Sequence, residues 1–327
     1  SEANESAVKL AIQYQASRGK PEKNIILTRT LSYHGTTLNM SGISGHAARK
    51  RGLESYVPKA PMIETPYPLR CPLGSFHSDA KDYYLNNLKE VIQKLGSENI
   101  AGLLMEPING SSGGAISPPG GYWEEAHKIL IDNDILLIAD EVMTGFGRVG
   151  EDFASNLYNL KPDILVAGKG MGGGYAAIGG TYSTDEIADS IQNAGYEVMF
   201  HTFAALPQSC AASAEVLKIL REEKLCERVN PLGQKILQNL NSEIGQHPNV
   251  AEIRGKGLLI GIEIVEDKTS LKPFDESNKI TSQIMQKGLE LGVFLYPGGT
   301  GEFRDIICLG PAFTIGDEEI EMMVSEV

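Results

Sequence analysis

A lysine between glycines, at the end of an apolar run, is the residue of this sequence best suited to covalent chemistry. Residues 162–169 read PDILVAGK, and the stretch GMGGG follows Lys169. An ammonium group in an apolar setting loses hydration, which lowers its pKa, and the neutral amine can form a Schiff base with a carbonyl. The flanking glycines let another molecule approach the backbone. Lys169 is therefore predicted to hold a carbonyl cofactor, although a lysine that reaches the surface is the simpler alternative.

Two carboxylates also stand at the ends of apolar runs. Asp140 follows LLIA, and Glu106 follows LLM. A carboxylate at the end of a buried strand is costly unless it is paired. Asp140 is therefore expected to cap a helix, to join a buried ion pair, or to bind a cationic ring nitrogen and so make that ring an electron sink.

The pattern of strands and helices brings these three residues together. Strands are predicted near 24–30, 100–107, 134–142, 162–169 and 176–183, with helices over the first residues and near 79–95 and 122–132. This alternation is typical of βαβ units and a mainly parallel sheet, an α/β class. Function in such sheets collects beyond the carboxyl ends of the strands, where Glu106, Asp140 and Lys169 all lie.

The sequence changes character after about residue 206. Two long helices precede a strand pair near 255–265, a helix near 276–291, two more strands and an acidic helix. We therefore predict a large cofactor-binding domain over 1–215 and a smaller C-terminal α+β domain over 216–327. Because Ser1 already has the position of a helix cap, we also expect that the natural protein has an N-terminal segment before it.

Composition excludes several classes of protein. The formal charge of -13 argues against a nucleic-acid surface, and neither a membrane span nor a signal peptide is recognisable. Four scattered cysteines indicate no disulfide framework or zinc site and favour the cytoplasm. Gly168, Gly170 and Gly173 match GxGxxG, but a strand is expected to follow where a dinucleotide-binding fold needs a helix.

Six short stretches, taken in order, resemble class III pyridoxal-phosphate aminotransferases of fold type I. They are SEANE, SYHG, LLMEP, ADEVMTGFGRVG, PDILVAGKG and HTF. The similarity runs along nearly the whole chain, and DEVxTGFGR with a GKG lysine at this distance is a specific signature. The resemblance implies the fold type I architecture, a mainly parallel large domain with a smaller C-terminal domain, and pyridoxal 5'-phosphate as cofactor.

The resemblance also implies a role for each matching residue. Lys169 would form the Schiff base and move the proton of the substrate, and Asp140 would bind the pyridine nitrogen. Val142 and Tyr33 would cover the two faces of the ring, and His34 belongs to the same cofactor site. An aromatic plate and a branched aliphatic side chain would hold a flat ring in one orientation.

Three further residues complete the implied cofactor site. Ser1 would receive the phosphate at a helix N-terminus, where free N–H groups favour an anion. Thr202 would reach the phosphate from the neighbouring subunit, which implies a homodimer with shared active sites. Glu106 would lie near the cofactor.

The sequence departs from the family where substrate carboxylates are bound. Members that act on ornithine-like amino acids have a Glu and an Arg at the positions of Ser111 and Cys308. Arg304 is therefore a candidate to bind a substrate carboxylate instead.

The implied reaction moves an amino group from an amine or amino acid to an oxo acid such as pyruvate or 2-oxoglutarate. A racemase, aminomutase or decarboxylase on the same fold stays open, because the cofactor carries the chemistry and the pocket selects the bond that breaks. The need for an added oxo acid separates these alternatives. A non-catalytic binding protein is the alternative from another class, and the Lys169–Asp140 pair argues against it.

Overall fold

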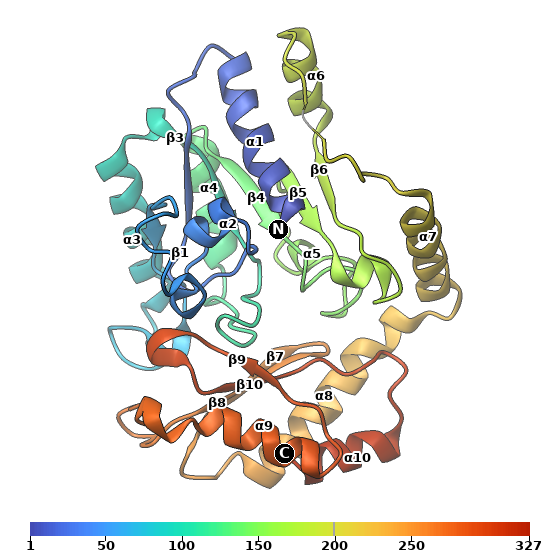
Figure 1. The fold of residues 1–327 in the computed structure, drawn as a ribbon. Helices are drawn as coiled ribbons and strands as arrows, with labels where there is room; N and C mark the ends of the chain where they lie inside the picture. Colours follow the sequence, from blue (N-terminus) through green and yellow to red (C-terminus); the bar gives the residue numbers. More distant parts are fainter. Residues whose placement is uncertain (199) are drawn as a thin grey trace.

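Two β-sheets organise the chain, which a computed structural model describes over residues 1–198 and 200–327 (Figure 1). The larger sheet of this described part has six strands in the order β2-β1-β3-β4-β5-β6. All neighbouring pairs are parallel except β5 and β6. The strands are β1 (Ile25–Arg29), β2 (Met62–Ile63), β3 (Ile100–Met105), β4 (Leu136–Asp140), β5 (Ile164–Ala167) and β6 (Gly180–Ser183). The predicted α/β class is confirmed.

Helices cover both faces of this sheet (Figure 1). Apolar side chains of α1 (Glu2–Ser17) and α6 (Asp185–Asn193) pack on one face, and those of α3 (Ala80–Leu95) and α4 (Tyr122–Asp132) pack on the other. Successive strand residues point to opposite faces, so Leu103 joins the α3–α4 core and the next residue joins the α1 core. Two short helices, α2 (Leu38–Ile43) and α5 (Ala154–Leu157), follow β1 and β4.

The second sheet is smaller and antiparallel. Its strands lie in the order β7-β8-β10-β9 and are β7 (Val250–Lys256), β8 (Leu259–Ile264), β9 (Tyr296–Gly298) and β10 (Ile306–Leu309). The helices of this half of the chain are α7 (Pro207–Glu222), α8 (Leu225–Ile244), α9 (Ile280–Glu290) and α10 (Asp317–Ser325). Within the described residues, no helix combines the length and the apolar content that a membrane crossing needs.

The sequence prediction was incomplete in several places. Helix α6 was not predicted, and neither was β2, because a strand of two residues gives no periodicity. The strand predicted from residue 176 begins only at Gly180. After Lys169 the glycines form a short 3-10 turn and the chain returns as β6, so the GxGxxG match opens no α-helix.

Glu141 fixes the turn that follows β4. Its side chain is fully buried and accepts hydrogen bonds from the backbone N–H of Ala154 at 2.9 Å and of Ser155 at 2.7 Å, at the start of α5. The hydroxyls of Thr144 and Ser155 donate to the same carboxylate. One side chain therefore joins the end of β4 to the next helix.

We predict that Glu141→Ala lowers the free energy of unfolding by about 2–4 kcal/mol, because it leaves buried N–H groups without acceptors. Glu141→Gln keeps one acceptor oxygen and should cost less. Urea denaturation midpoints measure both variants, with the exposed Glu151→Ala as the control. Equal stability of Glu141→Ala and Glu151→Ala would contradict this role.

Candidate functional site

The ends of three neighbouring parallel strands meet at one hollow. Strand β4 lies between β3 and β5, and each of the three ends at the same edge of the sheet. A hollow of about 200 Å³ opens there. The residues predicted from the sequence that line it are Ser1, Tyr33, His34, Glu106, Asp140, Val142 and Lys169.

Three hydrogen bonds hold the Asp140 side chain in this hollow. One oxygen, Oδ2, accepts from His34 Nδ1 and from Asn4 Nδ2, both at 2.8 Å, and Oδ1 accepts from the backbone N–H of Val142 at 3.1 Å. Burial favours the neutral acid, but the contacts with His34, Asn4 and Val142 outweigh it and lower the pKa of the Asp140 carboxyl. The site therefore presents a buried carboxylate that is ionised near neutral pH.

Two neighbours hold the histidine that contacts Asp140. His34 Nε2 lies 3.3 Å from the hydroxyl of Thr28, and the His34 backbone N–H donates to Ser44 Oγ at 2.8 Å. If Nδ1 carries the proton that it donates to Asp140, Nε2 is free to accept from Thr28. Asn4 also donates to the His34 carbonyl at 2.9 Å. Sequence reasoning missed Asn4, although it stands in the SEANE stretch one helical turn after Ser1.

Lys169 follows β5 in a backbone conformation that L-residues rarely adopt. Its φ is 42°, in the left-handed region, and its side chain lines the hollow that also contains Asp140. Lys169 is exposed towards the two hollows that it lines, yet desolvation by the surrounding protein lowers the pKa of its amine; the nearby carboxylates Asp140 and Glu106 oppose that shift and Arg49 adds to it. Backbone strain combined with a shifted pKa is typical of a functional side chain.

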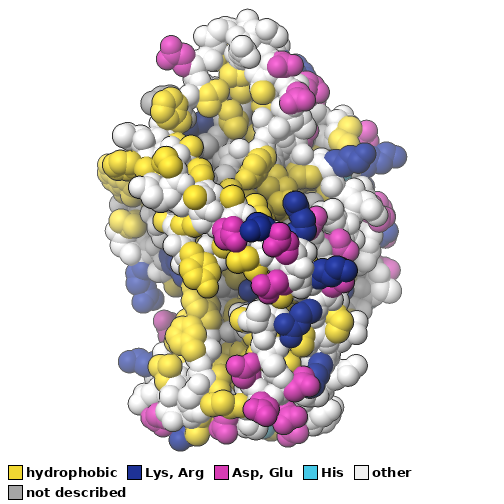
Figure 2. All heavy atoms as spheres, turned by 90° about the vertical axis from the view of Figure 1, so that its right-hand side faces the viewer, with side chains coloured by type: hydrophobic (Ala, Val, Ile, Leu, Met, Phe, Trp, Pro, Cys, Tyr) yellow, Lys and Arg dark blue, Asp and Glu magenta, His cyan; other side chains and the backbone are white. Residues whose placement is uncertain are grey.

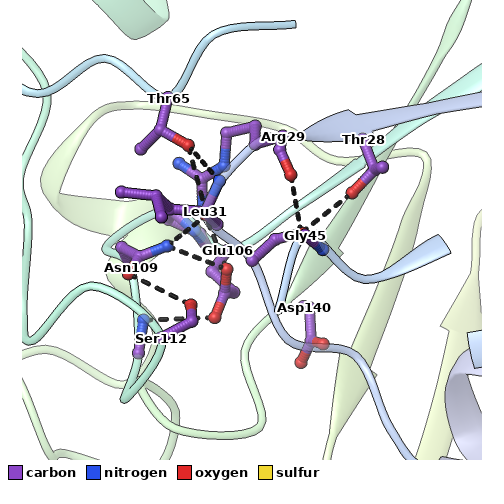
Figure 3. Close-up of polar contacts among 12 residues, drawn as sticks. Thr28, Arg29, Leu31, Gly45, Thr65, Glu106, Asn109, Ser112 and Asp140 are labelled. Carbon is purple, nitrogen blue, oxygen red and sulfur yellow. Dashed lines mark hydrogen bonds and ion pairs between the residues drawn. The ribbon is translucent and has the colours of Figure 1, made fainter. Parts of the chain in front are cut away.

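Glu106 has a different environment from Asp140 (Figure 3). It is buried and accepts from Arg29 Nη2 at 3.1 Å, from Asn109 Nδ2 at 3.3 Å and from the Gly110 backbone N–H at 3.1 Å. Burial raises the pKa of the Glu106 carboxyl, with the positive charge of Arg29 opposing it. These contacts fix the loop after β3, so Glu106 shapes one wall of the hollow.

A second and larger hollow, of about 730 Å³, shares Ser111, Val142, Met143 and Lys169 with the first. Its walls come mostly from apolar side chains of α7, of the β4–α5 loop and of the smaller sheet. Arg148 lies in this wall, but its Nη1 donates to the carbonyls of Pro311 at 2.7 Å and Leu258 at 3.3 Å. Burial lowers the pKa of Arg148 to about 10.

Ser111 and Cys308, the two departures from the family pattern, line this larger hollow together. Gly298 lies between them: a Cβ there would be 2.6 Å from Cys308 Sγ and 3.0 Å from the Ser111 carbonyl oxygen. Any larger side chain at Gly298 would collide with this wall. Neither of the two side chains carries a charge that could bind a carboxylate.

The structure places two predicted residues outside both hollows. Thr202 lies in an exposed turn between α6 and α7. Arg304 donates to the backbone carbonyls of Gly301 and Phe274 in the second half of the chain. Within this single chain, neither residue therefore reaches Lys169 or Asp140.

The residues of the smaller hollow fit a pyridoxal 5'-phosphate group. Asp140 supplies an ionised carboxylate for a protonated ring nitrogen, and Lys169 supplies an amine with a lowered pKa. Tyr33 and Val142 line the same space, and Ser1 stands at the N-terminus of α1, where an anion is favoured.

Comparisons with known proteins agree with this geometry. The family model described as aminotransferase class-III matches residues 1–327. An uncharacterized aminotransferase, YodT of Bacillus subtilis, is 37% identical over 99% of this chain and 74% of its own. Gamma aminobutyrate transaminase 3, chloroplastic, of Solanum lycopersicum is 34% identical over 99% of this chain and 62% of its own.

Solved structures show the same similarity. An amine transaminase from an uncultivated Pseudomonas species, in its PLP-bound form, superposes with a TM-score of 0.93 at 32% identity. The match covers 99% of this chain and 73% of the Pseudomonas chain. The fold is therefore that of the fold type I transaminases.

We predict that the pKa of the Lys169 amine lies below the ordinary lysine value, because burial disfavours the ammonium form. Competitive labelling of the cofactor-free protein with acetic anhydride over a pH series measures it. In Asp140→Asn the pKa should fall further, because the carboxylate stabilises the ammonium. Asp132→Asn, which removes an exposed carboxylate in α4, should leave it unchanged. A pKa that rises in Asp140→Asn would contradict this balance of charges.

Proposed function

The chain belongs to the class III aminotransferases, and we propose that it uses pyridoxal 5'-phosphate, held at Lys169 and Asp140, to move an amino group to an oxo acid. The donor is an amine or amino acid, and the acceptor is an oxo acid such as pyruvate or 2-oxoglutarate. One observation carries this proposal: an ionised carboxylate and an amine with a lowered pKa line the same hollow. The names of relatives that act on gamma-aminobutyrate and on amines support the donor class.

The roles that we propose for the residues follow from their contacts. When bound, the cofactor supplies an electron sink that weakens a bond at the amine-bearing carbon of the substrate. Asp140, held ionised by His34 and Asn4, keeps the ring nitrogen protonated. Lys169 Nζ would hold the cofactor covalently and would carry the proton of the substrate. The lowered pKa favours both tasks, because each begins from the uncharged amine.

The remaining residues bind and orient the cofactor. Tyr33 and Val142, which line the same hollow, would cover the two faces of its ring, and Ser1 with the first turn of α1 would bind its phosphate. Ser1 Oγ accepts from the backbone N–H of Thr36 at 3.0 Å, which ties the start of α1 to the turn that contains Tyr33 and His34. Glu106 supports the site through the loop that it fixes.

We further propose that the active protein is a homodimer in which Thr202 completes the phosphate site of the partner subunit. Phe203 and Phe200, on either side of Thr202, expose 76% and 81% of their surface, and Tyr175 exposes 86%. Figure 2 shows hydrophobic side chains gathered over this face of the molecule, which includes β6 and α7. Large exposed apolar patches mark interaction surfaces.

Two broader features complete the proposal. We place the protein in the cytoplasm, because its four cysteines are free and Cys210 is exposed. We assign residues 1–215 to a large cofactor-binding domain and 216–327 to a small domain. The two sheets support this division, and the boundary falls within α7 (Pro207–Glu222).

The central test replaces the lysine. Lys169→Ala should abolish turnover of an amine with pyruvate, because Lys169 is the one lysine among the described residues that lines these two hollows. Borohydride should fix cofactor to the wild-type chain and not to the variant. Lys161→Ala, at an exposed lysine outside both hollows, is the control. Full activity of Lys169→Ala would refute the proposed mechanism.

A second test concerns the dimer. We expect sedimentation to give twice the mass of one chain for the wild type, and Phe203→Glu to shift the equilibrium towards single chains, because it buries a charge in the interface. The activity should fall in parallel if Thr202 serves the partner's site. Ile131→Glu on α4, where 64% of the side chain is exposed, is the matched control. A Phe203→Glu protein that keeps the wild-type mass would exclude this interface.

A further inference from the structure

Arg49 is an unpaired cation beside the cofactor hollow. It belongs to the short 3-10 helix Ala47–Lys50 and is exposed, and no carboxylate pairs with it within the described residues. Its guanidinium carbon lies 4.4 Å from the centroid of the Tyr33 ring. Tyr33 in turn lines the hollow that contains Lys169 and Asp140. The aromatic ring therefore holds a charged group at the edge of the site.

The electrostatics around Tyr33 agree with this placement. The charge of Arg49 lies close enough to Lys169 to contribute to the lowered pKa of that amine. His46 packs against the edge of the Tyr33 ring, with the centroids 6.0 Å apart, and burial and Arg49 lower its pKa to about 4. His46 is therefore neutral near neutral pH, and the positive charge against the Tyr33 ring belongs to Arg49.

An oxo acid acceptor needs such a charge, because its carboxylate must be held while its carbonyl carbon reacts. Other cations near the hollows are already engaged. Arg148 donates to two backbone carbonyls and stacks on Phe313 at 4.7 Å. Lys169 is proposed to hold the cofactor, and Arg304 donates to backbone carbonyls outside both hollows.

We propose that Arg49 binds the carboxylate of the oxo acid acceptor, and of amino donors that carry one, at the Tyr33 side of the hollow. This inference rests on the proposed function and specifies its substrates. The apolar larger hollow, where Ser111 and Cys308 offer no charge, is left for the uncharged part of the donor. Amines without a carboxylate are donors that do not use Arg49.

Steady-state kinetics of the loaded enzyme give the first test. In Arg49→Gln the KM for pyruvate should rise about tenfold or more, the typical effect of losing a charged hydrogen bond, with little change in kcat. The KM for β-alanine should rise likewise, and the KM for benzylamine should not. Arg49→Lys keeps the charge but not the planar fork, so it should recover part of the loss. The control is Arg51→Gln, which removes a nearby cation that faces Glu276 at the surface, 3.9 Å away.

Binding gives a second readout that does not depend on turnover. Calorimetry compares phenylacetate, an inert carboxylate, with phenylacetamide, its neutral counterpart. The wild type and Arg51→Gln should prefer phenylacetate, and Arg49→Gln should lose that preference.

The outcomes separate this inference from the proposed function. Selective phenylacetate binding through Arg49 without any turnover would refute the transaminase proposal and leave the carboxylate site standing. Turnover in which Arg49→Gln changes neither the KM for pyruvate nor the phenylacetate preference would overturn the inference. An equal rise in the KM for benzylamine and for pyruvate would also overturn the inference, because it would show that Arg49 only supports Tyr33. A wild type that shows no preference for phenylacetate would overturn it too.

Discussion

The buried carboxylate of Asp140 is the constraint around which the rest of the site is arranged. A charge at the end of a central strand is tolerated only when hydrogen bonds replace its lost water. Three segments supply those bonds: Asn4 from α1, His34 from the turn after β1, and the Val142 backbone from the turn after β4. Satisfying one carboxylate therefore fixes the relative positions of all three segments.

The same arrangement sets the pKa of the Lys169 amine. Burial and the nearby charge of Arg49 lower the pKa of Lys169, and the carboxylates of Asp140 and Glu106 raise it. The amine therefore loses its proton more readily than an ordinary lysine, which favours both attack on a carbonyl and proton transfer. Its left-handed backbone, with φ at 42°, adds strain that the glycines around it help to accommodate.

Much of this site follows from sequence because strand ends can be recognised in it. Apolar runs predicted β3, β4 and β5, and the geometry of a parallel sheet then brought Glu106, Asp140 and Lys169 to one edge. Asn4 and Arg49 were missed, since their roles depend on contacts with distant residues, His34 and Asp140 in one case and Tyr33 in the other. Helix α6 was missed for a related reason: its two buried isoleucines become part of a core only by packing against α1 and the sheet.

The two carboxylates of the hollow show how neighbouring strands can give the same chemical group two functions. Glu106 is paired with Arg29 and also accepts from a loop backbone N–H, so its negative charge is already compensated within the protein. Asp140 accepts from His34 and Asn4, and the structure shows no arginine or lysine bound to it among the residues described. Burial raises the pKa of Glu106 against the opposing charge of Arg29, whereas for Asp140 the contacts with His34 and Asn4 outweigh burial and lower the pKa. Asp140 therefore remains the anion that can neutralise a cationic ring nitrogen, while Glu106 stabilises the wall around it.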